Sequence, residues 1–252
     1  MRVELLTVGT ELLLGQVVDT NGAELGRALA AAGAEVTRRS SVGDRADAIR
    51  DAVAQALDRT GFVIATGGLG PTSDDVTKRV VADLLGRPLR RDPAVARGLE
   101  ERFRRLGRPM PAANLGQADV PEGAVVLPNP RGTAPGLWIE DGRGRVVVLL
   151  PGVPSEMRGL LAEEVLPRVA SRPGGTGRVI RSRLLRTTGV AESAVAERVE
   201  PLEDRLQPLT LAYLPSVDGV DLRLTAWGLE PQEADARLAA GAELLGERLG
   251  ED

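Results

Sequence analysis

The stretch Phe62-Val63-Ile64-Ala65-Thr66-Gly67-Gly68-Leu69-Gly70-Pro71-Thr72-Ser73-Asp74-Asp75-Val76-Thr77 decides the expected fold. Its first five residues are apolar or β-branched, which is typical of a buried strand. Three glycines within the next four residues let the backbone approach a ligand closely, and a helix is predicted to begin at about Ser73. Ligands of open α/β sheets bind at such carboxyl ends of strands, so the stretch predicts both a fold and a site.

The same alternation of short strands and longer helical patterns runs through the first two thirds of the chain. The expected strands are Arg2–Val8, Glu35–Arg39, Phe62–Thr66 and Val146–Leu150. The helices between them repeat apolar residues at helical spacing, with N-caps predicted at Thr20, Asp44 and Ser73. Two short apolar runs, at 124–127 and 136–139, predict a two-stranded insertion. This pattern predicts a three-layer α/β fold around a mostly parallel sheet.

The composition limits the chemistry that the chain can perform. Its 252 residues include no cysteine and no histidine, which excludes disulfides, thiolate nucleophiles, imidazole bases and the common zinc sites. Aromatic residues make up only 2%, so the core must consist of Ala, Val and Leu. Any catalysis must therefore use carboxylates, hydroxyls, arginines, the single Lys78, backbone amides or a hard cation such as Mg²⁺.

Two carboxylates, Asp74 and Asp75, follow the glycine turn and are predicted to lie in the first helical turn. They would repel a bare phosphate, so a phosphate bound here implies a bridging cation. Mg²⁺ held by one or two carboxylates, phosphates and water fits this requirement. The alternative is that the two acidic residues only stabilise the helix dipole. We favour the functional interpretation because packing alone does not explain three glycines between a core strand and a helix.

Three further segments are candidate parts of the site. Residues 146–157 repeat the order of strand, Gly/Pro turn and helix, so Glu156 could be a ligand or base, or only a helix-stabilising residue. Residues 9–16 follow the first strand, and Asp19, Thr20 and Asn21 lie just downstream, with Thr20 best explained as an N-cap. The loop 129–136 could bind an anion through Arg131 or could simply connect a hairpin.

A breaker-rich linker at residues 171–177 predicts a domain boundary, with a first domain at 1–170 and a second at 178–252. The second domain reads as a small α+β unit of strand, helix, strand, strand and helix. It holds 9 arginines against 14 acidic residues, a net charge of −5. Because binding to nucleic acid needs a basic surface, this charge argues against a nucleic-acid partner.

The remaining charge and hydropathy patterns are those of a cytoplasmic protein. The N-terminal strand is too short and too acidic for a signal peptide, no apolar run is long enough to span a membrane, and the net charge of −4 gives no attraction to anionic surfaces. The arginines at 97–108 alternate with glutamates at i,i+4 spacing, as in Glu100 with Arg104 and Glu101 with Arg105. Such spacing indicates a solvated helix face rather than a nucleic-acid site.

Taken in order, several of these motifs resemble the N-terminal part of the CinA family over about residues 1 to 170. The matching motifs are Gly9–Gln16, Asp19–Asn21, Gly67–Thr72 with Asp74-Asp75, Gly107–Pro111, Asn129–Gly136 and Leu150–Pro154. The resemblance implies a molybdopterin-binding-like domain that acts as a metal-dependent ADP-ribose pyrophosphatase, followed by a small KH-like domain. The family's deamidase activity resides in a further domain beyond this segment and is not expected of it. Homodimers are a family expectation.

The resemblance also implies the residues of the site. Asp74 and Asp75 would hold the divalent ion, Mg²⁺ being the first candidate, and act in catalysis; a monovalent cation is a second candidate cofactor. The residues expected to bind the nucleotide are Thr10, Glu11, Asn21, Gly67, Gly68, Gly70, Pro71, Thr72, Gly132, Thr133, Gly152 and Glu156. Two departures from the family, Arg79 for an acidic residue and Gly116 for a lysine, favour an alternative in which a pterin or nucleotide is bound without turnover.

Overall fold

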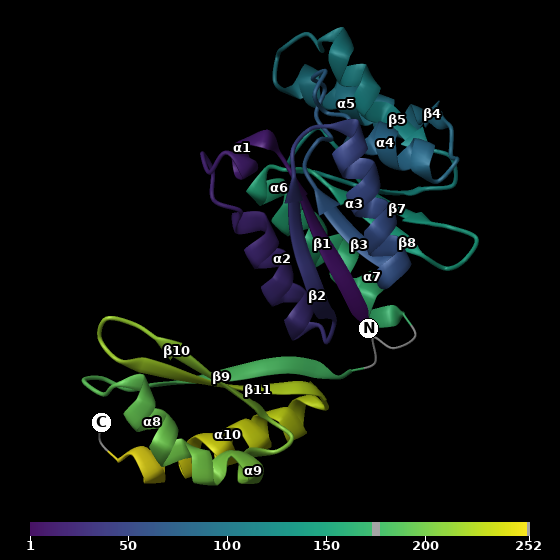
Figure 1. Ribbon diagram of the computed structural model, residues 1–252. Coiled ribbons are helices and arrows are strands. Elements are labelled where there is room, and N and C mark those ends of the chain that lie inside the picture. Colours follow the sequence, from purple (N-terminus) through teal and green to yellow (C-terminus); the bar gives the residue numbers. More distant parts are fainter. Residues whose placement is uncertain (173–176, 251–252) are drawn as a thin grey trace. The chain divides into compact units, whose positions relative to one another are not determined.

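A computed structural model describes residues 1–172 and 177–250 of the chain (Figure 1). The chain divides into two compact units. The first contains Met1–Leu29 and Glu35–Val169, and the second contains Ala30–Ala34 and Ala170–Asp252. Most of the predicted linker, residues 173–176, lies outside the described residues. No described helix combines the length and the apolar character needed to cross a membrane.

A six-stranded sheet forms the centre of the first unit. Its strands run in the order β2 (Glu35–Val42), β1 (Arg2–Val8), β3 (Phe62–Thr66), β8 (Val146–Leu150), β7 (Gly136–Glu140) and β6 (Val125–Leu127). Neighbours among the first four strands pair in parallel, whereas β7 pairs antiparallel with both β8 and β6. This confirms the mostly parallel sheet. The two runs of the predicted two-stranded insertion do pair with each other, as β6 and β7, but they also join the main sheet. Because β7 pairs along its length with β8 and is buried from Gly136 to Ile139, the hairpin forms the edge of the main sheet.

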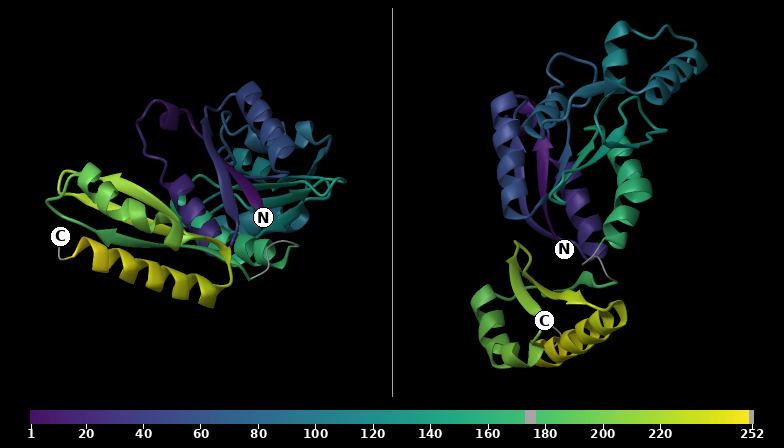
Figure 2. Two further views of the ribbon diagram at one scale, coloured as in Figure 1. Left: turned by 60° about the horizontal axis from the view of Figure 1, so that its bottom comes forward. Right: turned by 90° about the vertical axis from the view of Figure 1, so that its right-hand side faces the viewer.

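Helices cover both faces of this sheet, giving the three expected layers (Figures 1 and 2). The helices α3 (Ala46–Arg59) and α4 (Thr77–Leu84) pack on one face through an aliphatic cluster that includes Ile49, Val53 and Val80. The other face is covered by α2 (Thr20–Ala31), α6 (Pro154–Leu160), η2 (Leu161–Val165) and α7 (Leu166–Ser171). Side chains of Val, Leu, Ile and Ala fill both layers, as the low aromatic content predicts.

The segment between α4 and β6 was predicted only in part, as a solvated helix face at residues 97–108. It contains β4 (Leu89–Arg91), α5 (Pro93–Arg105), the 3-10 helix η1 (Ala112–Ala118) and β5 (Asp119–Pro121), and β4 pairs antiparallel with β5. The Asp92 carboxylate accepts hydrogen bonds from the backbone N–H groups of Ala94 (2.8 Å) and Val95 (3.0 Å), so it caps α5. This segment lies beside the glycine turn and contributes to the candidate site.

All three predicted N-caps are wrong. At α2, Asp19 provides the cap instead of Thr20, because its carboxylate accepts from the N–H of Gly22 at 2.8 Å. At α3, Asp44 points back to Thr10, and no side chain caps the helix. At α4, the helix begins at Thr77 rather than Ser73, since residues 71–75 form a turn closed by Asp75. Asp74 and Asp75 therefore precede the helix instead of lying in its first turn.

The second unit is a three-stranded antiparallel sheet covered on one face by helices. The strand order is β10 (Thr210–Pro215), β11 (Val220–Leu229) and β9 (Val179–Arg186). The helices are α8 (Glu192–Val199), the 3-10 turn η3 (Glu200–Leu202), α9 (Glu203–Leu206) and α10 (Pro231–Leu249). Leu222, Leu224, Leu238 and Leu245 are central to the core between sheet and helices. The predicted order of elements in this unit is confirmed.

Candidate functional site

The carboxyl ends of three neighbouring strands meet at one edge of the first unit's sheet. In the register of the sheet Thr7 pairs with Thr66, and Thr66 pairs with Leu150. The turns that begin at Gly9, Gly67 and Pro151 therefore leave the sheet side by side. The structure thus brings together three of the segments that the sequence singles out.

The glycine turn after β3 requires glycine at two consecutive positions. Gly67 has φ +108° and Gly68 has φ +67°, which side-chain-bearing residues rarely adopt. A Cβ on Gly67 would collide with the carbonyl oxygen of Val8, and a Cβ on Gly68 would collide with the hydroxyl of Thr77. The turn is anchored by Gly67 N–H, which donates to the carbonyl of Leu150 at 3.0 Å. Glycine is needed at both positions because neighbouring atoms leave no room for a Cβ, and not because the turn must be flexible.

Several polar groups of this turn are not used by the protein. Within the described residues, the backbone N–H groups of Gly68, Leu69 and Gly70 donate no hydrogen bond. The Thr77 hydroxyl, on the first residue of α4, is 0% exposed and has no hydrogen-bonding partner. A buried hydroxyl without a partner costs free energy, so it commonly marks a place that a ligand, ion or water satisfies. The sequence reasoning did not identify Thr77 as a site residue.

The two predicted metal ligands differ in their surroundings. Asp75 folds back on the turn, where its carboxylate accepts from the Thr72 N–H (2.9 Å) and the Thr72 hydroxyl (2.5 Å) and lies against Gly70. Asp74 is exposed, and the neighbouring Thr72 side chain and its own backbone amide lower its pKa. Asp74 is therefore ionised at neutral pH and accessible. Pro71 and Thr72 are exposed beside it, and their contact with a ligand stays a prediction.

A small cavity of about 130 Å³ lies next to the turn, between the end of β1, the start of α2 and the turn after β8. Its lining includes Glu11, Asn21 and Gly152, three of the predicted nucleotide-binding residues. The Asn21 side-chain amide donates to the Gly152 carbonyl (2.8 Å) and to the Thr66 hydroxyl (3.3 Å), while its buried Oδ1 has no partner. The cavity therefore offers an unused hydrogen-bond acceptor.

Thr10 is close to this cavity in sequence but does not line it. Both its N–H (2.8 Å) and its hydroxyl (2.9 Å) donate to the carboxylate of Asp44. Thr10 thus holds the first loop against the connection from β2 to α3. Its role as a direct nucleotide contact stays a prediction.

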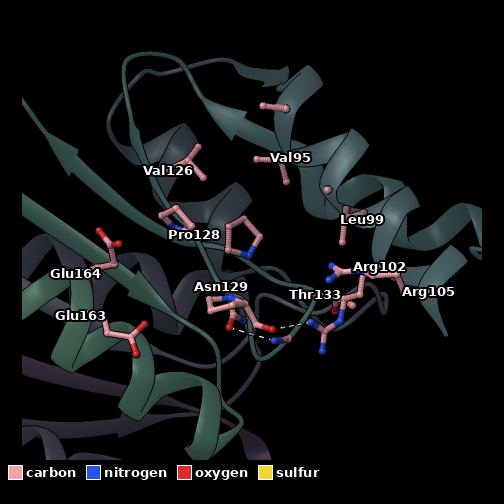
Figure 3. Close-up of a pocket in the computed structure, with 15 residues that line it drawn as sticks. Val95, Leu99, Arg102, Arg105, Val126, Pro128, Asn129, Thr133, Glu163 and Glu164 are labelled. Carbon is pink, nitrogen blue, oxygen red and sulfur yellow. Dashed lines mark hydrogen bonds between the residues drawn. The ribbon is translucent and has the colours of Figure 1, made fainter.

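Gly132, Thr133 and Glu156 belong to a different part of the first unit. Gly132 and Thr133 line a larger cavity of about 550 Å³ between α5 and the loop 128–135 (Figure 3). The Glu156 carboxylate accepts from the Asn129 side-chain amide at 2.6 Å and lies so close to Gly132 that a Cβ there would collide with it. Glu156 is therefore bound to this loop, and its predicted contact with a nucleotide stays untested.

The 3-10 helix η1 braces the glycine turn, which the sequence did not predict. Buried Gln117 accepts from the Asn114 side-chain amide (3.0 Å) and donates to the carbonyl of Leu69 (3.4 Å). Lys78, the only lysine, donates to the carbonyl of Gly116 at 2.7 Å. Burial lowers the pKa of Lys78 to about 8, so the amine is still mostly protonated at pH 7. The one feature of the sequence that could have pointed to this contact is that the single lysine directly follows Thr77.

The donor set around the turn fits a hard cation that is only partly held by protein. No group of three or more acidic side chains in the described residues forms a closed metal cage. Asp74 and Asp75 offer carboxylate oxygens, and the unpartnered Thr77 hydroxyl adds a neutral oxygen. Mg²⁺ commonly uses one or two carboxylates and completes its shell with phosphate oxygens and water. The residues present therefore fit Mg²⁺ together with a phosphate-bearing ligand.

Sequence comparisons show which family the chain is similar to. Residues 4–171 match the family described as "Probable molybdopterin binding domain", and residues 182–252 match the "Damage-inducible protein CinA KH domain". A CinA-like protein of Gemmatimonas aurantiaca is 51% identical over 99% of this chain and 59% of its own length. A CinA-like protein of Salinibacter ruber is 43% identical over 100% of this chain and 61% of its own length. The chain thus spans about three fifths of the length of these curated relatives.

A solved structure gives the same result. The crystal structure of the protein CinA from Thermoplasma acidophilum, whose function is described as unknown, superposes with a TM-score of 0.61 at 37% identity. The match covers 66% of this chain and 97% of that one.

Proposed function

Since the chain belongs to the CinA family, with a molybdopterin-binding-type domain followed by a CinA KH domain, we propose that its first unit hydrolyses the pyrophosphate of ADP-ribose or a related nucleotide diphosphate with the help of a divalent cation. The observation that carries the proposal is the glycine turn after β3. It combines unused backbone donors, an unpartnered buried hydroxyl and two carboxylates within eleven residues, Gly67 to Thr77.

The backbone of the turn supplies the phosphate contacts. The N–H groups of Gly68, Leu69 and Gly70 are available as donors, and the start of α4 adds the positive end of a helix dipole. Because Gly67 is fixed against Val8 and Leu150, these donors are held in place before a ligand arrives. Preorganised donors of this kind also stabilise the negative charge that grows on a phosphoryl oxygen during hydrolysis.

The carboxylates decide which phosphates can bind. The carboxylates of Asp74 and Asp75 repel a phosphate that comes without a cation. The two side chains, with the Thr77 hydroxyl, would hold Mg²⁺; when bound, Mg²⁺ polarises a phosphoryl oxygen and lowers the pKa of a coordinated water. The Thr72 hydrogen bonds keep the Asp75 carboxylate oriented for this role. Hydrolysis adds water across the bridging P–O bond and releases AMP and ribose 5-phosphate from ADP-ribose.

The small cavity beside the turn accommodates only part of a nucleotide. Its volume of about 130 Å³ is less than a nucleoside needs, but Asn21 Oδ1 and the Glu11 carboxylate are acceptors for sugar hydroxyls. We therefore assign it to a ribose next to the pyrophosphate. Because Asn21 also bonds Thr66 and Gly152, it links this cavity to the two strands that carry the turns.

AMP release from ADP-ribose in the presence of Mg²⁺ tests the proposal. We expect Asp75→Asn to lower kcat/KM by at least about 100-fold, since the amide keeps the Thr72 hydrogen bond but loses the charge. Asp83→Asn is the matched control, because Asp83 is an exposed carboxylate on α4 outside the turn, and it should retain wild-type activity. Equal rates in the Asp75→Asn variant and the wild type would remove this aspartate from the mechanism.

A second candidate is binding of a pterin or nucleotide without turnover. Two observations favour it: the family description names molybdopterin binding, and Arg79 and Gly116 depart from the residues usual in the family. Lys78 partly compensates for the missing lysine at position 116, because its ammonium group donates to the carbonyl of Gly116. Calorimetry that shows tight binding of ADP-ribose with Mg²⁺, together with no AMP release, would select this candidate.

A further inference from the structure

We propose that the larger cavity of the first unit, between α5 and the loop 128–135, is a second binding site that takes a small planar anion, an aromatic ring carrying one carboxylate or phosphate. The cavity has a volume of about 550 Å³, within the range of small-molecule sites. Neither Asp74 nor Asp75 lines it, and neither do the glycines of the turn after β3. It is therefore separate from the residues to which we assign hydrolysis.

The wall formed by the loop is rigid. Arg102 on α5 donates to the carbonyls of Pro130 (2.9 Å) and Arg131 (2.8 Å). The Asn129 side chain accepts from the N–H groups of Arg131 and Gly132, both at 3.1 Å, and donates to the carbonyl of Ala134 at 2.8 Å. Because these bonds fix the loop from both sides, the cavity is formed before any ligand enters. Preformed sites lose less free energy to ordering on binding.

The charges at the cavity do not cancel. Glu163 and Glu164 line one side, but Glu163 is paired with Arg131 (2.5 and 3.0 Å) and Glu164 with Arg168 (2.6 Å). The hydrogen bonds from Arg131 also lower the pKa of Glu163, so the pair stays ionised. On the α5 side, no carboxylate in the described chain pairs with Arg102 or Arg105. Counting these partners together with Glu156, whose carboxylate accepts from the lining residue Asn129, the cavity has an excess of one positive charge.

Figure 3 shows how these groups are distributed. Arg102 and Arg105 lie on the α5 side of the cavity, and Glu163 and Glu164 lie on the opposite side. Val95 and Leu99 lie on α5 with the arginines, and Val126 and Pro128 lie across from them on β6 and the loop that follows it, so aliphatic and proline surfaces complete the lining. Prolines and branched aliphatic side chains present flat apolar surfaces, which suit a planar ring. A ring between these surfaces would direct its anionic group towards the guanidinium of Arg105.

The Glu–Arg pairs predicted for α5 do not account for the positions of its arginines. The i,i+4 pairs Glu100 with Arg104 and Glu101 with Arg105 do not form ion pairs in the structure as far as it is described. Arg102 binds the loop, and Arg105 extends beside the cavity one turn later. The stretch that reads as a solvated face from sequence therefore contributes two of its arginines to a cavity.

Titration calorimetry with 2-naphthoate and its uncharged analogue 2-naphthamide tests the site. We expect naphthoate to bind at least about tenfold more tightly than naphthamide, as one charge-assisted hydrogen bond implies. Arg105→Gln should remove this preference, whereas Arg104→Gln, the matched control outside the cavity, should keep it. Repeating the titration with 2-naphthyl phosphate shows whether the site favours a carboxylate or a phosphate.

A second variant blocks the cavity without straining the fold. Gly98 lines the cavity on an exposed helical position, and a Cβ there meets no atom within 4 Å. Gly98→Leu should therefore fold normally and lose both ligands. Unchanged naphthoate affinity in Gly98→Leu, or equal affinity for the two ligands in the wild type, would overturn the proposal. Asp75→Asn should bind naphthoate like the wild type, which keeps this test independent of the proposed hydrolysis.

Discussion

The junctions after β3 and after β8 share one sequence pattern: a buried strand, a Gly/Pro turn and a helix. They differ in how many of their polar groups lack a hydrogen-bond partner within the protein. After β3 the helix begins only at Thr77, and the turn retains free N–H donors and an unpartnered hydroxyl. After β8 the helix begins at once, at Pro154, and the turn's carbonyls are occupied. Pro151 accepts from Thr66 (2.9 Å), and Gly152 accepts from Asn21 (2.8 Å).

The difference shows what distinguishes a candidate site from a supporting turn. Both junctions lie at the carboxyl ends of parallel neighbours, so position in the fold does not separate them. The separating property is whether polar groups already have partners within the protein. Groups that are held in place but unpartnered can bind a ligand, whereas the partnered groups after β8 fix the geometry of that ligand's surroundings.

Alanine substitution at the two turn glycines should give the largest contrast. Gly67→Ala should lower the free energy of unfolding by about 3 kcal/mol, because φ is +108° and the Cβ collides with the Val8 carbonyl. Gly152→Ala should change it by less than about 0.5 kcal/mol, since its Cβ would lie 3.4 Å from the nearest atom. Urea unfolding followed by Trp138 fluorescence, in a Trp227→Phe background, measures the first unit alone. Similar losses in both variants would break the comparison.

The pH dependence of stability should reveal the brace at Lys78. Burial lowers the pKa of Lys78 from 10.5 to about 8, so between these values the unfolded chain binds more protons than the folded one. The cost of burying the charged amine is thus fully present below pH 8 and is relieved as the pH rises to 10.5. Relative to that of Lys78→Met, the free energy of unfolding of the wild type should rise by about 2 kcal/mol between pH 7 and pH 10. A pH-independent difference would contradict the buried position of the amine.

Removing one hydroxyl from each junction gives a smaller and sharper test. Thr66→Val should destabilise by about 1 to 2 kcal/mol, because it leaves the Pro151 carbonyl without this donor and removes one of the two hydrogen bonds that the Asn21 amide donates. Thr77→Val removes a hydroxyl that has no partner, so stability should stay within about 0.5 kcal/mol of the wild type or increase. The same urea titration checks both. Equal destabilisation would mean that the Thr77 hydroxyl is used by the fold.

The sequence predicts the strands around the site well and the helix starts poorly. Bounds of β1, β3 and β8 agree with the predicted strands, because continuous apolar runs between turn residues leave little choice. Asp75 illustrates the failure: an acidic residue before a helix can cap it or close the preceding turn, and only the position of Thr72 decides. Likewise, the sequence predicts β7 as one strand of a two-stranded insertion, and only its long-range pairing with β8 shows that it belongs to the main sheet.

Parts of the candidate site that depend on distant segments could not be predicted. Glu11, Asn21 and Gly152 were predicted individually from strand ends, and the parallel register brings them around one cavity. The contacts of Gln117 with Leu69 and of Lys78 with Gly116 join segments about forty to fifty residues apart. No local pattern encodes such contacts. The separation of Gly132 and Thr133 into another cavity has the same cause, since α5 packs beside their loop.

The most direct test of the account is the dependence of ADP-ribose affinity on Mg²⁺, measured by calorimetry with Mg²⁺ and with EDTA. Because the carboxylates of the glycine turn repel an unshielded pyrophosphate, the wild type should bind at least about tenfold more weakly in EDTA. Asp75→Asn should lose most of this dependence, and Asp83→Asn should keep it. Equal affinity of the wild type with and without the cation would contradict a pyrophosphate site built on a shared metal.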